Sequence, residues 1–145
     1  MQADFSHEIS LANEFRYYLE DNGWCIYQLV CSGGQAHMSI SFNDLGFNKT
    51  VYPDVIALKD HTIMLGEIKN YYCEADREKL LEVSLSEVAK KRVRKIISMR
   101  SGIEADKLDI IFNLIHSDSK SLPCYCAGQF IKSGGNFNFI EPIPQ

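Results

Sequence analysis

Three charged residues interrupt two apolar, strand-like segments in the middle of the chain. Asp54 lies in segment 51–58 (VYPDVIAL), and Glu67 and Lys69 lie in segment 62–69 (TIMLGEIK). If the two segments form a hairpin across the short polar break between them, Asp54 lies directly opposite Glu67. Lys69 then shares their face of the sheet, because strand side chains alternate with a period of two. Two carboxylates and an ammonium group side by side are suited to holding a divalent cation that activates water.

The apolar neighbours of these residues favour a functional site over a surface ion pair. Like charges opposite each other destabilise a strand pair by roughly 0.2–1 kcal/mol, and burial increases that cost. A fold that places Asp54 beside Glu67 therefore needs a compensating cation, which Lys69 supplies in part. A divalent metal is the natural remainder, and carboxylate oxygens with open water positions suit Mg²⁺ or Mn²⁺ rather than zinc. The alternative is an ordinary cross-strand ion pair, which would contribute little.

The sequence Pro53-Asp54, followed after twelve residues by Glu67-Ile68-Lys69, resembles the signature of the PD-(D/E)xK, or restriction-endonuclease-like, nuclease superfamily. The resemblance implies an endonuclease that hydrolyses phosphodiester bonds with Mg²⁺ or Mn²⁺ as cofactor. It also implies that Asp54 and Glu67 bind the metal, with the backbone carbonyl of Ile68 as an additional ligand. Lys69 would orient the attacking water or neutralise the phosphate in the transition state. DNA is the default substrate of the family, and RNA stays open.

Many members of this superfamily add an acidic residue from their first helix. Glu8 is the favoured candidate here, because it lies on the same helical stripe as the apolar residues Leu11 and Phe15. Glu14 is the alternative, although it points roughly away from the side of the helix that carries Leu19. An acid in a first helical turn is also favoured by the helix dipole, so a purely structural role for Glu8 stays open.

The pattern of apolar residues predicts a mixed α/β fold for the whole chain, 1–145, as one nuclease domain. The expected order is α-β-β-β-α-β with a C-terminal β element, a restriction-endonuclease-like core in which helices flank a mixed central sheet. The resemblance covers about residues 5–115 of that order. We expect helices over 5–22 and 75–100, strands over 24–31, 37–42, 51–58, 62–69 and 107–115, and a last hairpin over 129–140. The strand over 107–115 should be central, since its middle is apolar on both faces.

One basic stretch stands out on a chain whose net charge is −4. Residues 88–100 (VAKKRVRKIISMR) carry six of the fifteen lysines and arginines and no acid. This asymmetry favours contact with nucleic-acid phosphates beside the hairpin, through Lys90, Lys91, Arg94 and Lys95. The alternative is a solvated helix face with a Glu87–Lys91 pair at i, i+4.

Composition limits the class of protein. The apolar fraction of 46% and the charged fraction of 23% are ordinary for a soluble globular protein. We find no segment long enough to cross a bilayer and no secretory signal, so we expect no membrane association. Five scattered cysteines argue against a disulfide framework and for a reducing, cytoplasmic compartment: Cys25, Cys31, Cys73, Cys124 and Cys126. Cys124 and Cys126 lack the second ligand pair of a structural zinc site, and free thiols are expected.

The role of such a nuclease is less specified than its chemistry. We favour a restriction or defence, mobile-element or repair role, because junction-cutting enzymes are usually more basic than this chain. A structure-specific endonuclease resembling Holliday-junction resolvases is the first alternative. A non-catalytic nuclease-fold module for DNA binding or assembly is the second, although all three motif residues are present. One such site cleaves one strand, so a double-strand cut would require a homodimer or a larger complex.

Overall fold

The computed structural model describes residues 5–30 and 38–144. Helices cover α1 (Phe5–Asp21), α2 (Glu74–Leu85) and α3 (Glu87–Ser101), with a 3₁₀ turn, η1, at Ala105–Lys107. The strands are β1 (Cys25–Leu29), β2 (Ile40–Phe42), β3 (Lys49–Val51), β4 (Val55–Lys59), β5 (Thr62–Ile68), β6 (Asp109–His116), β7 (Gly128–Ser133) and β8 (Asn136–Ile140). The fold is therefore α/β, as the sequence predicts.

The described residues form a mixed six-stranded sheet in the order β1-β4-β5-β6-β7-β8, with β2 and β3 as a separate two-stranded ribbon. Strands β5, β6 and β7 run parallel to one another, whereas the outer pairs are antiparallel. The chain passes from β5 to β6 through α2 and α3, the type of crossover that a parallel pair requires. Strand β6 lies between β5 and β7, which confirms the expected central position.

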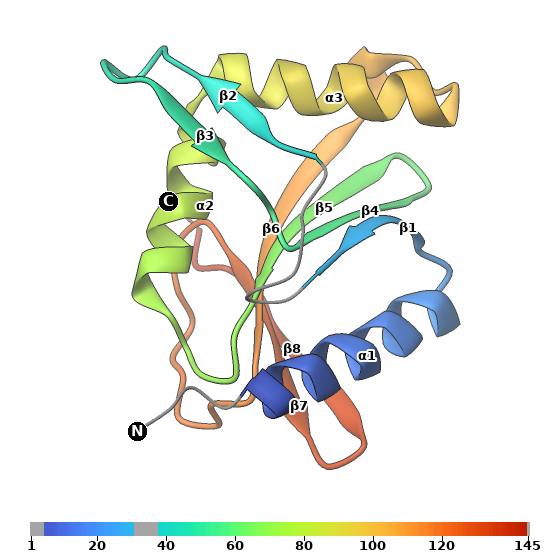
Figure 1. Cartoon of the computed structure of the whole chain (residues 1–145), viewed down its shortest axis with the longest axis vertical. Helices are drawn as coiled ribbons and strands as arrows, with labels where there is room; N and C mark the ends of the chain where they lie inside the picture. Colours follow the sequence, from blue (N-terminus) through green and yellow to red (C-terminus); the bar gives the residue numbers. More distant parts are fainter. Residues whose placement is uncertain (1–4, 31–37, 145) are drawn as a thin grey trace.

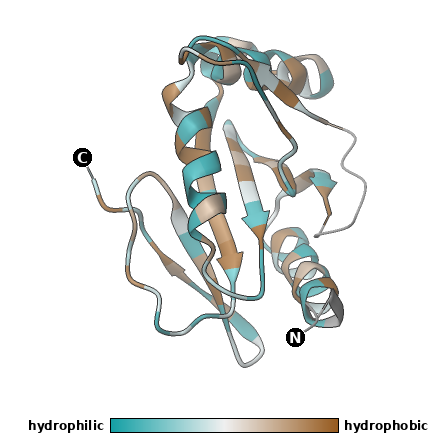
Figure 2. Cartoon of the chain, turned by 60° about the vertical axis from the view of Figure 1, so that its left-hand side comes forward, coloured by the Kyte–Doolittle hydropathy of each residue, from teal (hydrophilic) through white to brown (hydrophobic). Residues whose placement is uncertain are grey.

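Helices cover both faces of this sheet (Figure 1). Helix α1 packs on one face, where Leu11, Phe15 and Leu19 are buried against alternate residues of β4 and β5. Rings of α1 and of the β7–β8 hairpin extend that contact: Phe15, Tyr18, Phe130 and Phe137. Helices α2 and α3 and the β2–β3 ribbon cover the opposite face. In Figure 2 the strands behind α2 are largely hydrophobic, whereas α2 itself carries mostly hydrophilic residues.

The long helix expected over 75–100 is wrong: the chain forms two helices that meet at Ser86. Ser86 has extended dihedral angles and is the N-cap of α3, where its Oγ accepts a hydrogen bond from the Ala89 amide at 2.9 Å. The same hydroxyl donates to Asp44 Oδ1 at 2.5 Å. The apolar stripe is interrupted at this break, where Leu85, the last residue of α2, is 56% exposed. A capping serine satisfies amides that a new helix leaves open, which is why the break is stable.

The single strand expected over 51–58 is also wrong, because β3 ends at Val51 and β4 begins at Val55. Pro53 lies in the break, has no amide to donate, and is buried. Its carbonyl accepts a hydrogen bond of 2.7 Å from Gln28 Nε2, and the buried Gln28 also receives the Met38 amide at 2.8 Å. These hydrogen bonds fix the backbone of the break and place Asp54 immediately before β4.

The cysteine and membrane expectations have partial outcomes. Cys25, Cys73, Cys124 and Cys126 are free thiols, as predicted, whereas Cys31 lies outside the described residues. Among the helices that the structure describes, none has the length and apolar character that crossing a membrane demands. The cytoplasmic, reducing compartment stays a prediction.

Candidate metal-binding site

The β4–β5 hairpin brings Asp54 and Glu67 together, as the expected register requires. Val55 pairs with Gly66, so Asp54, one residue earlier, lies opposite Glu67. The Asp54 amide donates to Glu67 Oε2 at 3.0 Å, and the Ile68 amide donates to Asp54 Oδ2 at 2.9 Å. Each carboxylate is thus held through one oxygen by a backbone amide from the opposite side of the hairpin.

The turn and one glycine make this pairing close enough. Asp60 has a φ of 54° at the turn between β4 and β5, a left-handed conformation that aspartate tolerates. Gly66 leaves room for its neighbours, since a Cβ there would lie 3.0 Å from Ile115 Cδ1 and 3.3 Å from Val55 Cβ. A larger residue at 66 would push β4 and β6 apart immediately beside the two acids.

Backbone hydrogen bonds to β1 and β6 continue past the ends of β4 and β5 and fix the backbone at Asp54 and Lys69. The Asp54 carbonyl accepts from the Val30 amide at 2.8 Å, which continues the β1–β4 pairing beyond β4. The Lys69 amide donates to the Ile115 carbonyl at 3.0 Å, which continues the β5–β6 pairing beyond β5. Asp54 and Lys69 therefore lie just outside their strands with an ordered backbone.

The two acids take positions that the core would otherwise use. The core on this face contains alternate residues of the two strands: Ile56 and Leu58 of β4, and Ile63 and Leu65 of β5. Because side chains alternate along a strand, Asp54 and Glu67 continue these apolar columns on the face covered by α2 and α3. A pair of carboxylates in this setting is a departure from the pattern that stability alone would favour.

Burial changes the acidity of both groups. Glu67 is 2% exposed, and this burial, together with the nearby Asp54 carboxylate, raises the pKa of Glu67 to about 8. Lys79 and the Asp54 amide oppose that increase. Burial also raises the pKa of Asp54, while the Ile68 amide opposes the shift. Both groups can therefore be ionised together only when positive charge lies close to them.

That charge comes from a residue that sequence reasoning missed. The Lys79 ammonium of α2 forms an ion pair with Glu67 Oε1, with 29% of the Lys79 side chain exposed and 1% of the Glu67 side chain. Asp76, one turn earlier on α2, acts electrostatically on Asp54. A usable signal was the helical spacing of Asp76 and Lys79 with the buried Leu80 and Val83, which places all four on the side of α2 that faces the sheet.

Lys69 lies between acids from two helices. Burial would lower the pKa of Lys69, but Asp76 and Glu8 outweigh burial, so that its pKa is raised and it stays protonated. The structure thus brings Lys69 near Glu8 and Asp76, whereas the cation that pairs with Glu67 is Lys79.

The two acids proposed for the first helix have different surroundings. Glu8 is 5% exposed, and its Oε2 has no hydrogen-bond partner within the described part of the chain. Glu14 forms an ion pair with Lys132 of β7 and accepts a hydrogen bond from Ser10 at 3.2 Å. Only Glu8 acts on Lys69, which agrees with the preference for Glu8. No hydrogen bond or ion pair joins Glu8 to Asp54 or Glu67 among the described residues.

The hairpin offers few side-chain oxygen atoms that could bind a metal ion. Within residues 5–30 and 38–144, no group of three or more His, Cys, Asp or Glu side chains is arranged to hold a metal ion. Two adjacent carboxylates remain, and Mg²⁺ is commonly held by one or two carboxylates with water completing its shell. The buried Glu8 oxygen without a partner lies near Lys69, at the same end of the hairpin. Asp54 and Glu67 are thus the oxygen donors that the hairpin offers to Mg²⁺ or Mn²⁺, and the role expected of the Ile68 carbonyl stays a prediction.

The basic helix is not brought to the carboxylates by any contact in the described structure. Lys90 pairs with Glu87 at 2.8 Å, in place of the Glu87–Lys91 pair that the alternative interpretation of a solvated face assumed. Arg94 Nε donates to the Leu108 carbonyl at 2.9 Å. Lys91 and Lys95 are exposed. The cation beside the hairpin acids is Lys79 of α2, and α3 instead lies against β2, η1 and α2.

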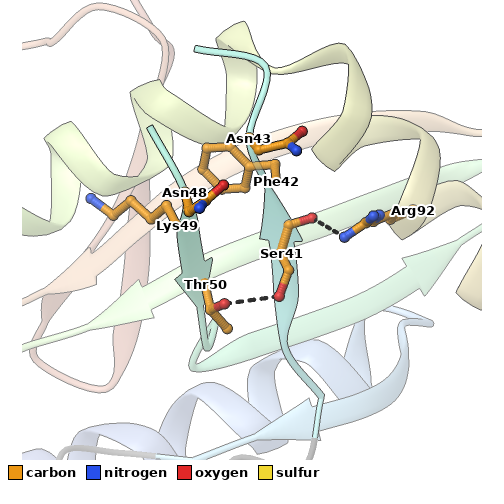
Figure 3. A pocket seen from close by; sticks show the side chains of 7 residues that line it. All are labelled: Ser41, Phe42, Asn43, Asn48, Lys49, Thr50 and Arg92. Carbon is orange, nitrogen blue, oxygen red and sulfur yellow. Dashed lines mark hydrogen bonds between the residues drawn. The ribbon is translucent and has the colours of Figure 1, made fainter. Parts of the chain in front are cut away.

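Arg92 of this basic stretch contributes to a separate pocket. A cavity of about 280 Å³ lies over the β2–β3 ribbon, where Arg92 donates to the Ser41 carbonyl at 2.5 Å. Figure 3 labels the residues that line it. Ser41 and Thr50 share a hydrogen bond of 2.8 Å between their hydroxyls across the ribbon. Lys49, also at this pocket, pairs with Glu82 of α2 at 2.6 Å. Arg92 of α3 and Lys49 of the ribbon thus hold the ribbon to α3 and α2.

Comparisons of the chain with protein-family models, with curated proteins and with solved structures gave no match. The arrangement of the residues themselves therefore carries the functional argument.

Proposed function

We propose that this protein is a divalent-metal-dependent nuclease with a restriction-endonuclease-like core, and that DNA is its substrate. The observation that carries the proposal is the reciprocal pairing of Asp54 and Glu67 on the hairpin. It is the geometry that the resemblance to the PD-(D/E)xK superfamily requires, and the spacing of the two residues in the sequence predicts it. The helix–hairpin–helix–strand order around it also supports that fold.

Local charge supports a divalent cofactor. When all are ionised, the carboxylates of Asp54, Glu67, Glu8 and Asp76 outnumber the ammonium groups of Lys69 and Lys79 by two. A buried surplus of negative charge is unfavourable, and one Mg²⁺ or Mn²⁺ would neutralise it. Such an ion, when bound, lowers the pKa of a water ligand and stabilises charge on a phosphate.

The chain's own residues have distinct roles in this proposal. Asp54 and Glu67 hold the ion, and the two backbone amides keep their oxygens oriented. Lys69 stays protonated beside Glu8 and Asp76, so it can donate a hydrogen bond to a phosphate oxygen or to the attacking water. Glu8 supplies a buried oxygen that can accept a proton or orient a water molecule.

One observation favours a second candidate, a nuclease-fold module without catalysis. Lys79 neutralises Glu67 with no metal, and two carboxylates are fewer ligands than many metal enzymes supply. In that case the protein would bind nucleic acid or a partner and would not cleave.

Plasmid cleavage with Mn²⁺ distinguishes the two candidates. We expect the wild type to nick the plasmid and Asp54→Asn and Lys69→Ala to lose at least about 100-fold in rate, a loss typical of removing one transition-state contact. Asp54→Asn should also lose Mn²⁺ binding in calorimetry, whereas Lys69→Ala should keep it. Lys107→Ala, at an exposed lysine paired with Glu104, is the control and should cleave normally. Equal cleavage by all variants would refute the assignment of the site, and no cleavage by the wild type would refute the nuclease assignment.

A further inference from the structure

The hydrogen bonds of the hairpin divide the carboxylate oxygens into two kinds. Asp54 Oδ2 and Glu67 Oε2 each accept a backbone amide and are held in place. The second oxygen of Glu67, Oε1, is the atom that contacts the Lys79 ammonium. Glu67 Oε1 is thus the Glu67 oxygen that no backbone amide engages and is best placed for a cation, and Lys79 already contacts it.

We infer that Lys79 occupies the cation position of the candidate metal site and must withdraw from Glu67 before a divalent metal binds. Lys79 is in this view a positioning residue: it keeps Glu67 in place when no metal is present, and it lowers the affinity of the site for metal. The inference rests on the proposed function, because it takes Asp54 and Glu67 as the metal ligands.

Electrostatics require the exchange. Mg²⁺ lies about 2.0–2.1 Å from its oxygen ligands, and an ammonium group on the same oxygen would be only a few ångströms from the ion. Coulomb repulsion at such a distance is strong where water is largely excluded, and the Glu67 side chain is 1% exposed. The ion and the ammonium group cannot share Oε1 at low cost.

The surroundings of Lys79 allow it to leave without unfolding α2. Leu80 and Val83 anchor the helix in the core, so the helix axis can stay in place. The Lys79 side chain is 29% exposed and has a flexible four-carbon stem, which lets its charged end reach solvent. Asp76, three residues earlier, offers another carboxylate within reach on the same side of the helix.

The test is Mg²⁺ affinity measured by isothermal titration calorimetry on the whole chain, at about pH 9, above the value of about 8 to which the pKa of Glu67 is raised. We expect Lys79→Met to bind Mg²⁺ about tenfold more tightly than the wild type, or about 1.4 kcal/mol. The conservative variant Lys79→Arg should bind like the wild type, because it keeps a cation on Glu67. Loss of Lys79 makes Glu67 hold its proton more tightly, which opposes the expected gain and cannot produce it.

Lys49→Met is the matched control. Lys49 also forms a half-exposed ion pair with a glutamate of α2, Glu82, and its removal changes the net charge by the same amount. Its Mg²⁺ affinity should equal that of the wild type within about twofold. Unfolding in urea should show that both methionine variants remain folded, so that affinities are compared between folded proteins.

The outcomes separate this inference from the proposed function. Binding of Mg²⁺ by the wild type with equal or weaker binding by Lys79→Met would overturn the role of Lys79 and leave the nuclease proposal standing. Tighter binding by Lys49→Met as well would also overturn it, since the gain would then reflect net charge alone. Absence of Mg²⁺ binding in every variant would refute the metal site itself.

Discussion

Replacing Glu67 by glutamine should flatten the pH dependence of stability in the metal-free protein. In the folded chain the pKa of Glu67 is raised from 4.5 to about 8. Between these values the native state binds a proton that the unfolded state releases, so stability falls as the pH rises through this window. Glutamine cannot ionise, and its amide oxygen can still accept the Asp54 amide.

The magnitude follows from the size of the shift. One pKa unit corresponds to about 1.4 kcal/mol, so the wild type should lose on the order of 5 kcal/mol between about pH 4.5 and about pH 8. Burial raises the pKa of Asp54 too, against the opposing hydrogen bonds with the Ile68 amide and Glu67, so ionisation of Asp54 also costs stability. The lost Lys79 ion pair works in the other direction, but that lysine can turn to solvent. At alkaline pH we expect Glu67→Gln to be the more stable protein.

Urea unfolding from about pH 5 to about pH 9, with a chelator present, measures the effect. Burial lowers the pKa of His116, a base, so this group makes stability fall as the pH drops below its usual 6.5. His116 is the same in both proteins, and the difference between the two profiles cancels it. Glu104→Gln, at an exposed glutamate paired with Lys107, is the control and should follow the wild type. Parallel profiles for wild type and Glu67→Gln would refute the reasoning.

Two further predictions concern α3. Ser86→Ala removes the cap of α3 and the hydrogen bond to Asp44, and should lower the free energy of unfolding in urea by about 1–2 kcal/mol. Ser86→Thr should retain most of that stability. An unchanged urea midpoint for the alanine variant would contradict the capping role. Lys91→Glu with Lys95→Glu, both at exposed positions, should weaken DNA binding and reduce the salt slope by about two, and an unaltered slope would remove α3 from the nucleic-acid interface.

Local patterns in the sequence were sufficient for the hairpin. A strand has a period of two, and the polar residues between 51–58 and 62–69 leave one register that buries both apolar sets, so Asp54 had to lie opposite Glu67. The observed pairing of Val55 with Gly66 confirms that register. The central position of β6 and the final hairpin were predictable for the same reason, since each depends on neighbours in sequence.

Features that depend on distant partners were not predictable in this way. The break at Ser86 is stabilised by Asp44, which lies in a loop before β3, and the apolar residues on both sides look like one continuous helix. Lys79 is an ordinary polar residue of α2 until the crossover places that helix against β5. The position of the basic stretch depends on the same crossover, and periodicity reveals which side of a helix is buried but not which strand it meets.

The acid pair is best explained by function because stability alone disfavours it. Branched apolar residues at 54 and 67 would continue the columns of Ile56 and Leu65 and would need no ion pair, and such replacements of buried charges are often neutral or stabilising. The protein instead keeps two carboxylates whose pKa values are both raised, and holds their oxygens with backbone amides. Raised pKa values together with oxygens held by backbone amides are typical of carboxylates that a cation neutralises. Since Lys79 neutralises only one of the two, the remaining charge is what a divalent ion would satisfy after displacing that lysine.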